Sequence, residues 1–122
     1  MRRPIAELAK TEPPSHHTMK LRIHGNSVRI RLGQTEVARL AAGQSVEQIT
    51  QFSIRSTLRS VIEPTNELKS VQATFDQGCV LMRLPLDVVK DWASSDRVGI
   101  EVEQTVDDQG RLKILIEKDF EC

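Results

Sequence analysis

Four basic side chains near the start of the sequence, Lys20, Arg22, Arg29 and Arg31, are spaced in a way that suits anion binding. A two-residue turn at Gly25-Asn26 would pair Arg22 with Arg29 across two antiparallel strands. Lys20 would face Arg31 in the same way. Like charges directly opposite each other destabilise a sheet unless an anion lies against them. Because guanidinium groups bind phosphate and carboxylate oxygens through paired N–H donors, we expect these residues to bind a small anion or an acidic protein segment.

The same basic residues have a second interpretation, in which the anion comes from the protein itself. Neighbouring strands carry carboxylates that would serve: Glu47, Glu63, Glu101, Glu103 and Glu117. Exposed ion pairs of this kind are common in sheets and individually weak. A carboxylate within ~4 Å of Arg22, Arg29 or Arg31 would favour this second interpretation.

Residues suited to catalysis are scarce. Glu101 and Glu103 alternate on one strand face, where two carboxylates can bind a divalent cation or act as acid and base, although ordinary exposed strands carry such pairs too. His24 sits at the expected hairpin tip, and the sequence has no glycine-rich phosphate loop. We therefore expect a non-enzymatic binding or protein-interaction module with no cofactor and no metal site.

An enzymatic alternative starts from the mixture of arginine and glutamate on the strand faces. Some eight-stranded antiparallel tunnels process triphosphates with a metal ion and carry an ExExK strand. The segment Glu101-Val102-Glu103-Gln104 resembles part of that motif but lacks the lysine. A metal-dependent phosphate- or triphosphate-processing enzyme of this tunnel type would need its charged side chains to point inward.

Length and composition restrict the class of protein. The 122 residues suit one domain, and no apolar run approaches the ~18 residues needed to cross a membrane. The 17 basic and 17 acidic residues and the 3% of aromatic residues argue against nucleic-acid binding. Two cysteines without metal-binding spacing indicate a reducing cytoplasm. The partners that fit are another protein, a second copy of the chain or a small anion.

Charge is unevenly distributed along the chain. Residues 1–61 carry ten basic and four acidic residues, and residues 62–122 carry seven and thirteen. An asymmetry of this size predicts oppositely charged surfaces that a partner would recognise, unless folding interleaves the two halves and cancels the field.

The sequence also matches itself at an offset of 52 residues. Residues 27–51 align without a gap on residues 79–103, which places Val46 on Val98. Each half shows two alternating strands around a two-residue turn, then a short helix, then two more strands. Ile49 is out of phase with Val46, which predicts a β-bulge in the third strand. Trp92 takes the place of Leu40 on a helix and is expected to pack in the core.

These patterns predict an α+β domain made of two tandem strand–strand–helix–strand–strand repeats, residues 19–63 and 69–118. About eight mostly antiparallel strands would form a strongly curled sheet or a closed barrel with two short helices. Residues 1–18 are expected to be a flexible N-terminal extension that includes His16-His17, with Met19 as a candidate start of the protein.

The chain resembles a family of small uncharacterised bacterial proteins in its opening MKLRIHGNSVRIRL and its closing EKDFEC. Members open with the form MKLRIxGNSxRxRL and close with EKDFxC, and the resemblance covers residues 19–122. It implies a domain of unknown function and assigns no catalytic or binding residue.

Overall fold

The computed structural model describes residues 19–120, which form eight strands and two helices. In chain order the elements are β1 (Lys20–Ile23), β2 (Ser27–Leu32), α2 (Gln34–Ala41), β3 (Val46–Ser53), β4 (Ser56–Thr65), β5 (Gln72–Asp76), β6 (Cys79–Pro85), α3 (Leu86–Ser94), β7 (Gly99–Thr105) and β8 (Arg111–Lys118). The α+β class and the order of elements agree with the prediction. The expected extension and its two histidines lie outside the described residues. No helix within residues 19–120 is long and apolar enough to span a membrane.

The strands form two separate four-stranded sheets, so the expectation of one curled sheet or a closed barrel is wrong. Sheet A has the order β1-β2-β8-β7, and sheet B has the order β3-β4-β6-β5. Neighbouring strands are antiparallel except at the centre of each sheet, where β2 and β8, and β4 and β6, run parallel. Each sheet therefore combines one hairpin from each half of the chain. Alternation of apolar and polar residues indicates which face of a strand is buried, but not which hairpins pair.

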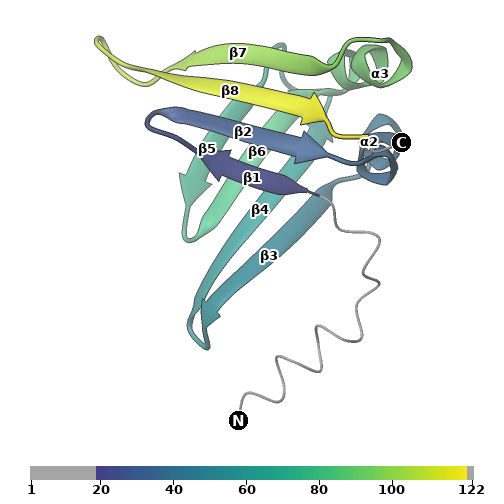
Figure 1. Ribbon diagram of the computed structural model, residues 1–122. Coiled ribbons are helices and arrows are strands. Elements are labelled where there is room, and N and C mark those ends of the chain that lie inside the picture. Colours follow the sequence, from purple (N-terminus) through teal and green to yellow (C-terminus); the bar gives the residue numbers. More distant parts are fainter. Residues whose placement is uncertain (1–18, 121–122) are drawn as a thin grey trace.

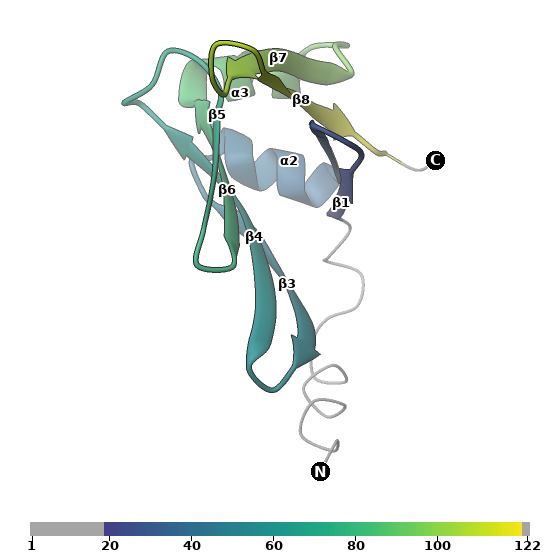
Figure 2. The ribbon, with the colours of Figure 1, turned by 90° about the vertical axis from the view of Figure 1, so that its left-hand side faces the viewer.

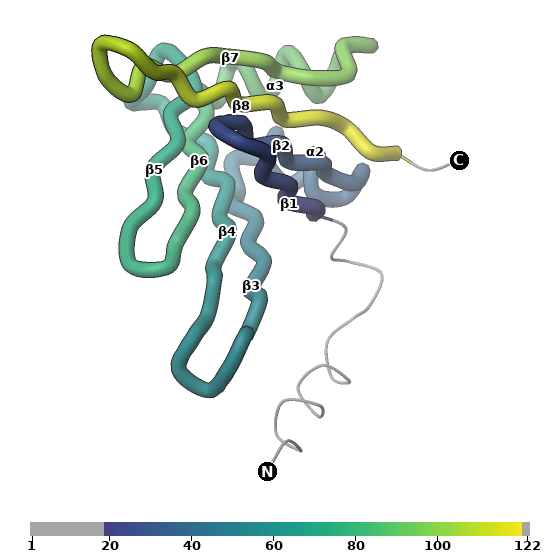
Figure 3. The backbone as a smooth tube through the Cα atoms, turned by 60° about the vertical axis from the view of Figure 1, so that its left-hand side comes forward, coloured from purple at the N-terminus to yellow at the C-terminus, as the bar shows by residue number. Residues whose placement is uncertain are grey.

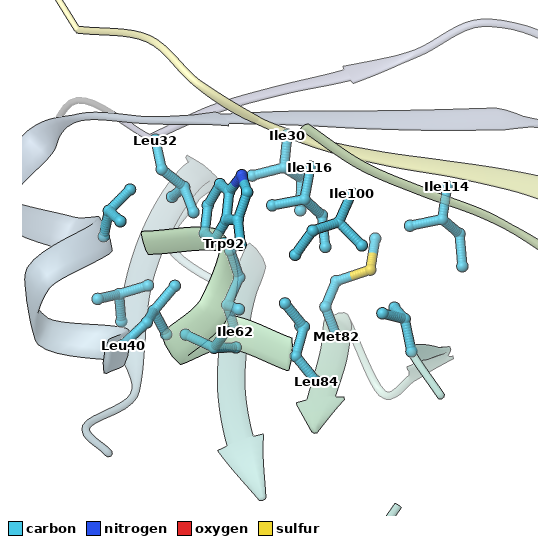
Figure 4. Packing of buried hydrophobic residues seen from close by; sticks show 14 of the residues in the cluster. Ile30, Leu32, Leu40, Ile62, Met82, Leu84, Trp92, Ile100, Ile114 and Ile116 are labelled. Carbon is cyan, nitrogen blue, oxygen red and sulfur yellow. The ribbon is translucent and has the colours of Figure 1, made fainter. Parts of the chain in front are cut away.

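The two sheets pack against each other across one hydrophobic core. Figure 1 shows the strands of sheet A crossing those of sheet B, with α2 and α3 next to each other at one end. Figure 4 shows side chains from both sheets and both helices meeting between the layers. The largest side chains with less than 2% exposure are Trp92, Ile30, Leu32, Leu40, Ile62, Met82, Leu84, Ile114, Ile116 and Val89. The core thus draws on both halves of the chain.

The hairpins of sheet B project beyond sheet A. Figures 2 and 3 show β3–β4 and β5–β6 extending past the layer formed by sheet A. Phe52, Ile54 and Phe75 lie at or near the tips of these hairpins and are mostly exposed. The core therefore ends before the tips of sheet B are reached.

Trp92 is a core residue, as the sequence predicts. Its side chain is completely buried, and its indole N–H donates a hydrogen bond to the carbonyl of Val98 at 3.1 Å. The ammonium group of Lys118 lies 5.7 Å from the ring centroid, within the range of a cation–π interaction. The one polar group of the indole, its N–H, is therefore bonded inside the protein, so a role for the ring in ligand stacking is not needed to explain it.

The β-bulge in β3 lies further along the strand than the sequence indicates. Ile49 pairs with Arg59 in regular register, and its side chain is 58% exposed on the outer face. The register shifts between Gln51 and Ser53 instead, which leaves Phe52 as the extra residue. The bulge expected in this strand is therefore confirmed, but the reason for expecting it is wrong, because Ile49 does not face the core and single apolar side chains are common on protein surfaces.

Two-residue turns connect β1 to β2 and β5 to β6. In the first turn Gly25 has a φ of +56°. In the second, both Gln77 and Gly78 have positive φ, of +52° and +75°. Positive φ at both central positions is the type I′ geometry, which favours asparagine and glycine. Gln77 therefore holds a left-handed conformation that costs a residue with a Cβ atom roughly 1 kcal/mol.

Replacing Gln77 by glycine should raise the free energy of unfolding by about 0.5–1 kcal/mol, because glycine adopts positive φ without a steric penalty. Urea denaturation measures this change. The matched control is Gln109→Gly, an exposed turn residue that lacks positive φ. An equal or larger stabilisation in the control would contradict the explanation.

Candidate functional site: a cationic face on sheet A

The four predicted binding residues lie together on the outer face of sheet A. The register of the first hairpin pairs Lys20 with Arg31 and Arg22 with Arg29, as the sequence predicts. Ile30, between two of these arginines, is buried in the core. Because side chains alternate between the two faces of a strand, the four cations project away from the core. We call this group of four residues the cationic face.

Glu117 of β8 lies between two of the cations. One of its carboxylate oxygens accepts hydrogen bonds from Nε of Arg29 at 2.9 Å and from Nε of Arg31 at 3.3 Å. The other oxygen accepts one from Nη2 of Arg29 at 3.4 Å. The hydrogen bond from Arg29, more than any other contact, lowers the pKa of Glu117, while partial burial acts in the opposite direction. For Arg29 and Arg31, a neighbouring strand therefore does supply an anion.

The other two cations are less well neutralised. The ammonium group of Lys20 lies 3.1 Å from the carboxylate of Asp119, but its side chain is 62% exposed. Arg22 forms no ion pair with any residue between 19 and 120. Four cations thus share the carboxylates of Glu117 and Asp119. The cationic face keeps an excess of positive charge, and Arg22 is its least neutralised member.

Carboxylates occupy the opposite edge of the same outer face. Glu101 and Glu103 on β7 are exposed, and Glu103 forms an ion pair with Arg111 at 3.5 Å. Across the part of the chain that the structure describes, no three His, Cys, Asp or Glu side chains are grouped so as to hold a metal ion. The two other glutamates considered from the sequence belong to sheet B. Glu117 is therefore the one of the five that reaches the cationic face.

The orientation of the strands removes the basis for a tunnel enzyme. Ile30 and Ile116 are buried, and Leu21 and Val28 pack against the same core. A triphosphate tunnel would need charged side chains in these inward positions and a closed sheet, whereas sheets A and B remain separate. Within residues 19–120 the buried side chains are apolar except for Ser60 and Glu36.

Folding places the basic half and the acidic half of the chain in the same sheets. Sheet A takes β1 and β2 from the first half and β7 and β8 from the second. Its strands carry seven basic and three acidic residues, whereas the strands of sheet B carry two and three. The charge asymmetry along the chain thus becomes a difference between the two sheets, with the positive excess on sheet A.

One arginine–glutamate pair occurs at corresponding places in both sheets. Arg31 on β2 lies opposite Glu117 on β8, and Arg83 on β6 lies opposite Glu63 on β4. The closest N–O distances are 3.3 Å and 3.9 Å. Each pair joins the two central parallel strands of its sheet. We therefore assign Arg31 a structural role in strand pairing in addition to its place on the cationic face.

The other cations of the first hairpin have neutral counterparts in the second. The two hairpins pair in corresponding registers 52 residues apart. Lys20, Arg22 and Arg29 correspond in this way to Gln72, Thr74 and Leu81. Because the second hairpin forms the same strand pairs without these cations, positive charge at the three positions is not a requirement of the fold.

A contact between the edges of the two sheets was not predicted from the sequence. The side-chain amide of Gln104 on β7 accepts a hydrogen bond from the N–H of Ala73 on β5 at 2.7 Å and donates one to its carbonyl at 2.8 Å. An open cleft of about 540 Å³ lies beside it, lined by residues 68, 70–72 and 102–105. This cleft is at the edge of sheet A opposite to the cationic face. Nothing in the local sequence distinguishes Gln104 from other strand glutamines.

Residues 19–122 match a protein family described as a family of unknown function (DUF7009). The match agrees with the domain of unknown function expected from the opening and closing motifs. No curated protein matches the chain. A function is therefore inferred below from the geometry of the cationic face.

Replacing Glu117 by glutamine should lower the free energy of unfolding by about 1 kcal/mol at neutral pH, because Arg29 and Arg31 lose the carboxylate between them. The pKa of Glu117 is lower in the folded protein than its ordinary value of 4.5. The stabilisation by the Glu117 carboxylate is therefore complete at pH values above 4.5 and is lost as the pH falls through the lower pKa that Glu117 has in the folded protein. Urea denaturation from about pH 7 to about pH 3 should show a shallower acid loss of stability in Glu117→Gln.

The control for this experiment is Glu103→Gln, which removes a more exposed carboxylate with a single 3.5 Å ion pair. It should alter the pH dependence less than Glu117→Gln does. The same pH dependence in both variants would show that Glu117 has no special role.

Proposed function

This chain belongs to a family of unknown function (DUF7009), and we propose that it is a non-enzymatic binding or protein-interaction module of the cytoplasm that captures carboxylate or phosphate groups on sheet A. The binding residues in this proposal are Lys20, Arg22, Arg29 and Arg31. An acidic protein segment and a small anion offer these cations the same oxygen chemistry. The observation that carries the proposal is that, among residues 19–120, the four cations of this face have ion pairs with two carboxylates, those of Glu117 and Asp119.

Arg22 has the greatest capacity to bind a ligand. It lies directly opposite Arg29, and its guanidinium group has no hydrogen bond or ion pair to the described part of the chain. A guanidinium group offers five N–H donors, which suits a carboxylate or phosphate held through two parallel hydrogen bonds. Arg29 directs two of its nitrogens to Glu117, so it would contribute mainly its charge.

The positive charges oppose the folding of the hairpin that carries them. Lys20 and Arg31 lie opposite each other, and so do Arg22 and Arg29, and such like-charged pairs are destabilising. The second hairpin, with neutral residues at three of these positions, shows that the fold does not need them. A bound anion would reduce the repulsion, so binding should also stabilise the folded protein.

The shape of the site favours a ligand with several negative charges. The cationic face is the outside of a sheet, and the cleft beside Gln104 lies at the other edge. A ligand on an open face stays in contact with water, where each ion pair is weak and is screened by salt. Several carboxylates or phosphates acting together would provide affinity that one group would not.

We also infer that the two halves of the chain arose by internal duplication. Both have the same order of elements, and both contribute to an arginine–glutamate pair between central parallel strands. The pairing of Val46 with Ile62 corresponds to that of Ile100 with Ile116, 54 residues later. The offset of 52 therefore applies only to the first hairpin of each half, β1–β2 and β5–β6. The second hairpins, β3–β4 and β7–β8, are 54 residues apart, so the second half has two additional residues before β7. The gapless placement of Val46 on Val98 is not the one that strand pairing supports.

The cytoplasmic assignment is supported by cysteine usage. The chain has two cysteines, which lack the number and spacing of a disulfide framework. Cys79 is free and half-buried on sheet B.

Replacing Arg22 by glutamine should weaken the binding of inorganic triphosphate and of a synthetic glutamate-rich peptide about tenfold, since charge-assisted hydrogen bonds are lost. Isothermal titration calorimetry at low and high salt measures both ligands. The matched control is Arg55→Gln, which removes an exposed arginine at the tip of the β3–β4 hairpin. The control should bind like the native protein.

Replacing Arg22, Arg29 and Arg31 together by alanine should abolish binding while circular dichroism shows a folded protein. Retained affinity in this triple variant would refute the proposal. Binding of the peptide without triphosphate would identify an acidic protein segment as the source of the anion, and the reverse would identify a small anion.

A further inference from the structure

β1 is an edge strand, and its outer side is not paired with any strand in residues 19–120 (Figure 1). His24 donates its N–H to the carbonyl of Ser27 at 3.0 Å, so these two residues form a hydrogen-bonded pair. Hydrogen-bonded and non-hydrogen-bonded pairs alternate along an antiparallel ladder. The N–H and C=O groups of Leu21 and Ile23 therefore point away from β2. Two donors and two acceptors line this edge of sheet A.

The corresponding edge of β5 is blocked at one residue, Ala73, by a side chain. Ala73 corresponds to Leu21, and its N–H and C=O groups point away from β6 in the same way. Both groups are bonded to the amide of Gln104, at 2.7 Å and 2.8 Å. A side-chain amide offers one donor and one acceptor, as a strand backbone does. Gln104 therefore takes the place of part of a neighbouring strand.

The first half of the chain has no such amide. Thr50 pairs with Leu58 on β3–β4 as Gln104 pairs with Leu112 on β7–β8, so Thr50 is the residue that corresponds to Gln104. Its short hydroxyl side chain makes no hydrogen bond to β1 within the described range. The edge of β1 thus stays open where the edge of β5 is closed, although unpaired strand edges are generally blocked in soluble proteins.

We propose that the open edge of β1 binds an extended acidic segment of a partner protein as an additional strand of sheet A. The proposal rests on anion capture by the cationic face and names the partner class and the mode of binding. Main-chain hydrogen bonds to Leu21 and Ile23 would provide affinity, and alternate side chains would provide specificity. Acidic residues at every second position would project over the outer face, toward Lys20 and Arg22.

The inner face determines the residues between the acidic ones. Leu21 packs against the core, and Ile23 is 61% exposed on the same side of the strand. An apolar residue of the added strand would cover Ile23, and such cross-strand apolar pairs stabilise sheets. A segment in which acidic and apolar residues alternate therefore matches both faces of β1.

A second copy of the chain offers a less suitable segment. In β7 the acidic Glu101 and Glu103 alternate with Ile100 and Val102, as the proposal requires. However, Ile100 is buried in its own core, and the outer side of β7 borders the cleft lined by residues 68 and 70–72. We therefore assign the added strand to another protein.

The test uses a synthetic acetylated peptide in which glutamate and valine alternate. Ile23→Pro removes an N–H group from the open edge but leaves the β1–β2 hydrogen bonds intact, since proline is tolerated at such edge positions. Calorimetry should show about tenfold weaker peptide binding and unchanged triphosphate binding. The matched control, Ile23→Val, keeps the N–H group and should bind the peptide like the native protein.

A second measurement does not depend on a variant folding correctly. Every second amide of the added strand would donate its N–H to β1, and the intervening amides would point to solvent. N-methylation of the first set should therefore abolish binding, and N-methylation of the second set should leave it nearly unchanged. Equal effects of the two methylated peptides would overturn edge pairing. Sedimentation that shows self-association lost in Ile23→Pro would assign the edge to a second copy and overturn the proposal.

The outcomes for the two proposals are separable. Peptide binding that is lost in Arg22→Gln but unaffected by Ile23→Pro and by N-methylation would leave anion capture standing and reject edge pairing. If the native protein binds neither the peptide nor triphosphate, both anion capture and edge pairing are rejected.

Discussion

Parallel pairing between hairpins from opposite halves of the chain is the constraint on which the rest of the structure depends. β2 lies beside β8, and β4 lies beside β6, so neither half completes a sheet alone. The inward-facing residues of these four strands form much of the core, and the two helices close one end of it. A segment ending after β4 would leave two hairpins with uncovered apolar faces. The same pairing brings Glu117 from the end of the chain to Arg29 near its start.

Local features of the sequence predicted the local structure well. The alternation around Gly25-Asn26 was enough to predict the register of the first hairpin, because a two-residue turn leaves one way to pair the strands. Long-range features were not predictable in this way. The bulge in β3 was expected because of Ile49, which is exposed and paired in regular register, and the choice of β8 as neighbour of β2 depends on packing across the whole core. For the candidate site, the four cations were identified correctly as one cluster, but five glutamates were equally eligible to neutralise it.

The cationic face joins two roles in one small area. Arg31 belongs to a pairing that both sheets share, whereas Lys20, Arg22 and Arg29 have no charged counterpart in the second hairpin. Glu117 keeps two arginines in place and leaves Arg22 without a partner among the described residues. Arg31 thus contributes to the pairing of strands in sheet A. The positive charges of Lys20, Arg22 and Arg29 are not needed for folding, because like-charged cross-strand pairs destabilise a sheet.

The hydrogen bonds between Gln104 and Ala73 set a limit on assembly. Two similar hairpins with open edges would give the molecule two places for strand addition, and a partner with repeated segments would then crosslink many copies into an aggregate. One glutamine side chain closes the edge of β5 at Ala73, while Thr50 leaves the edge of β1 open. Strand addition at β5 would therefore form fewer main-chain hydrogen bonds than at β1, which makes growth of a fibre through this second edge less favourable.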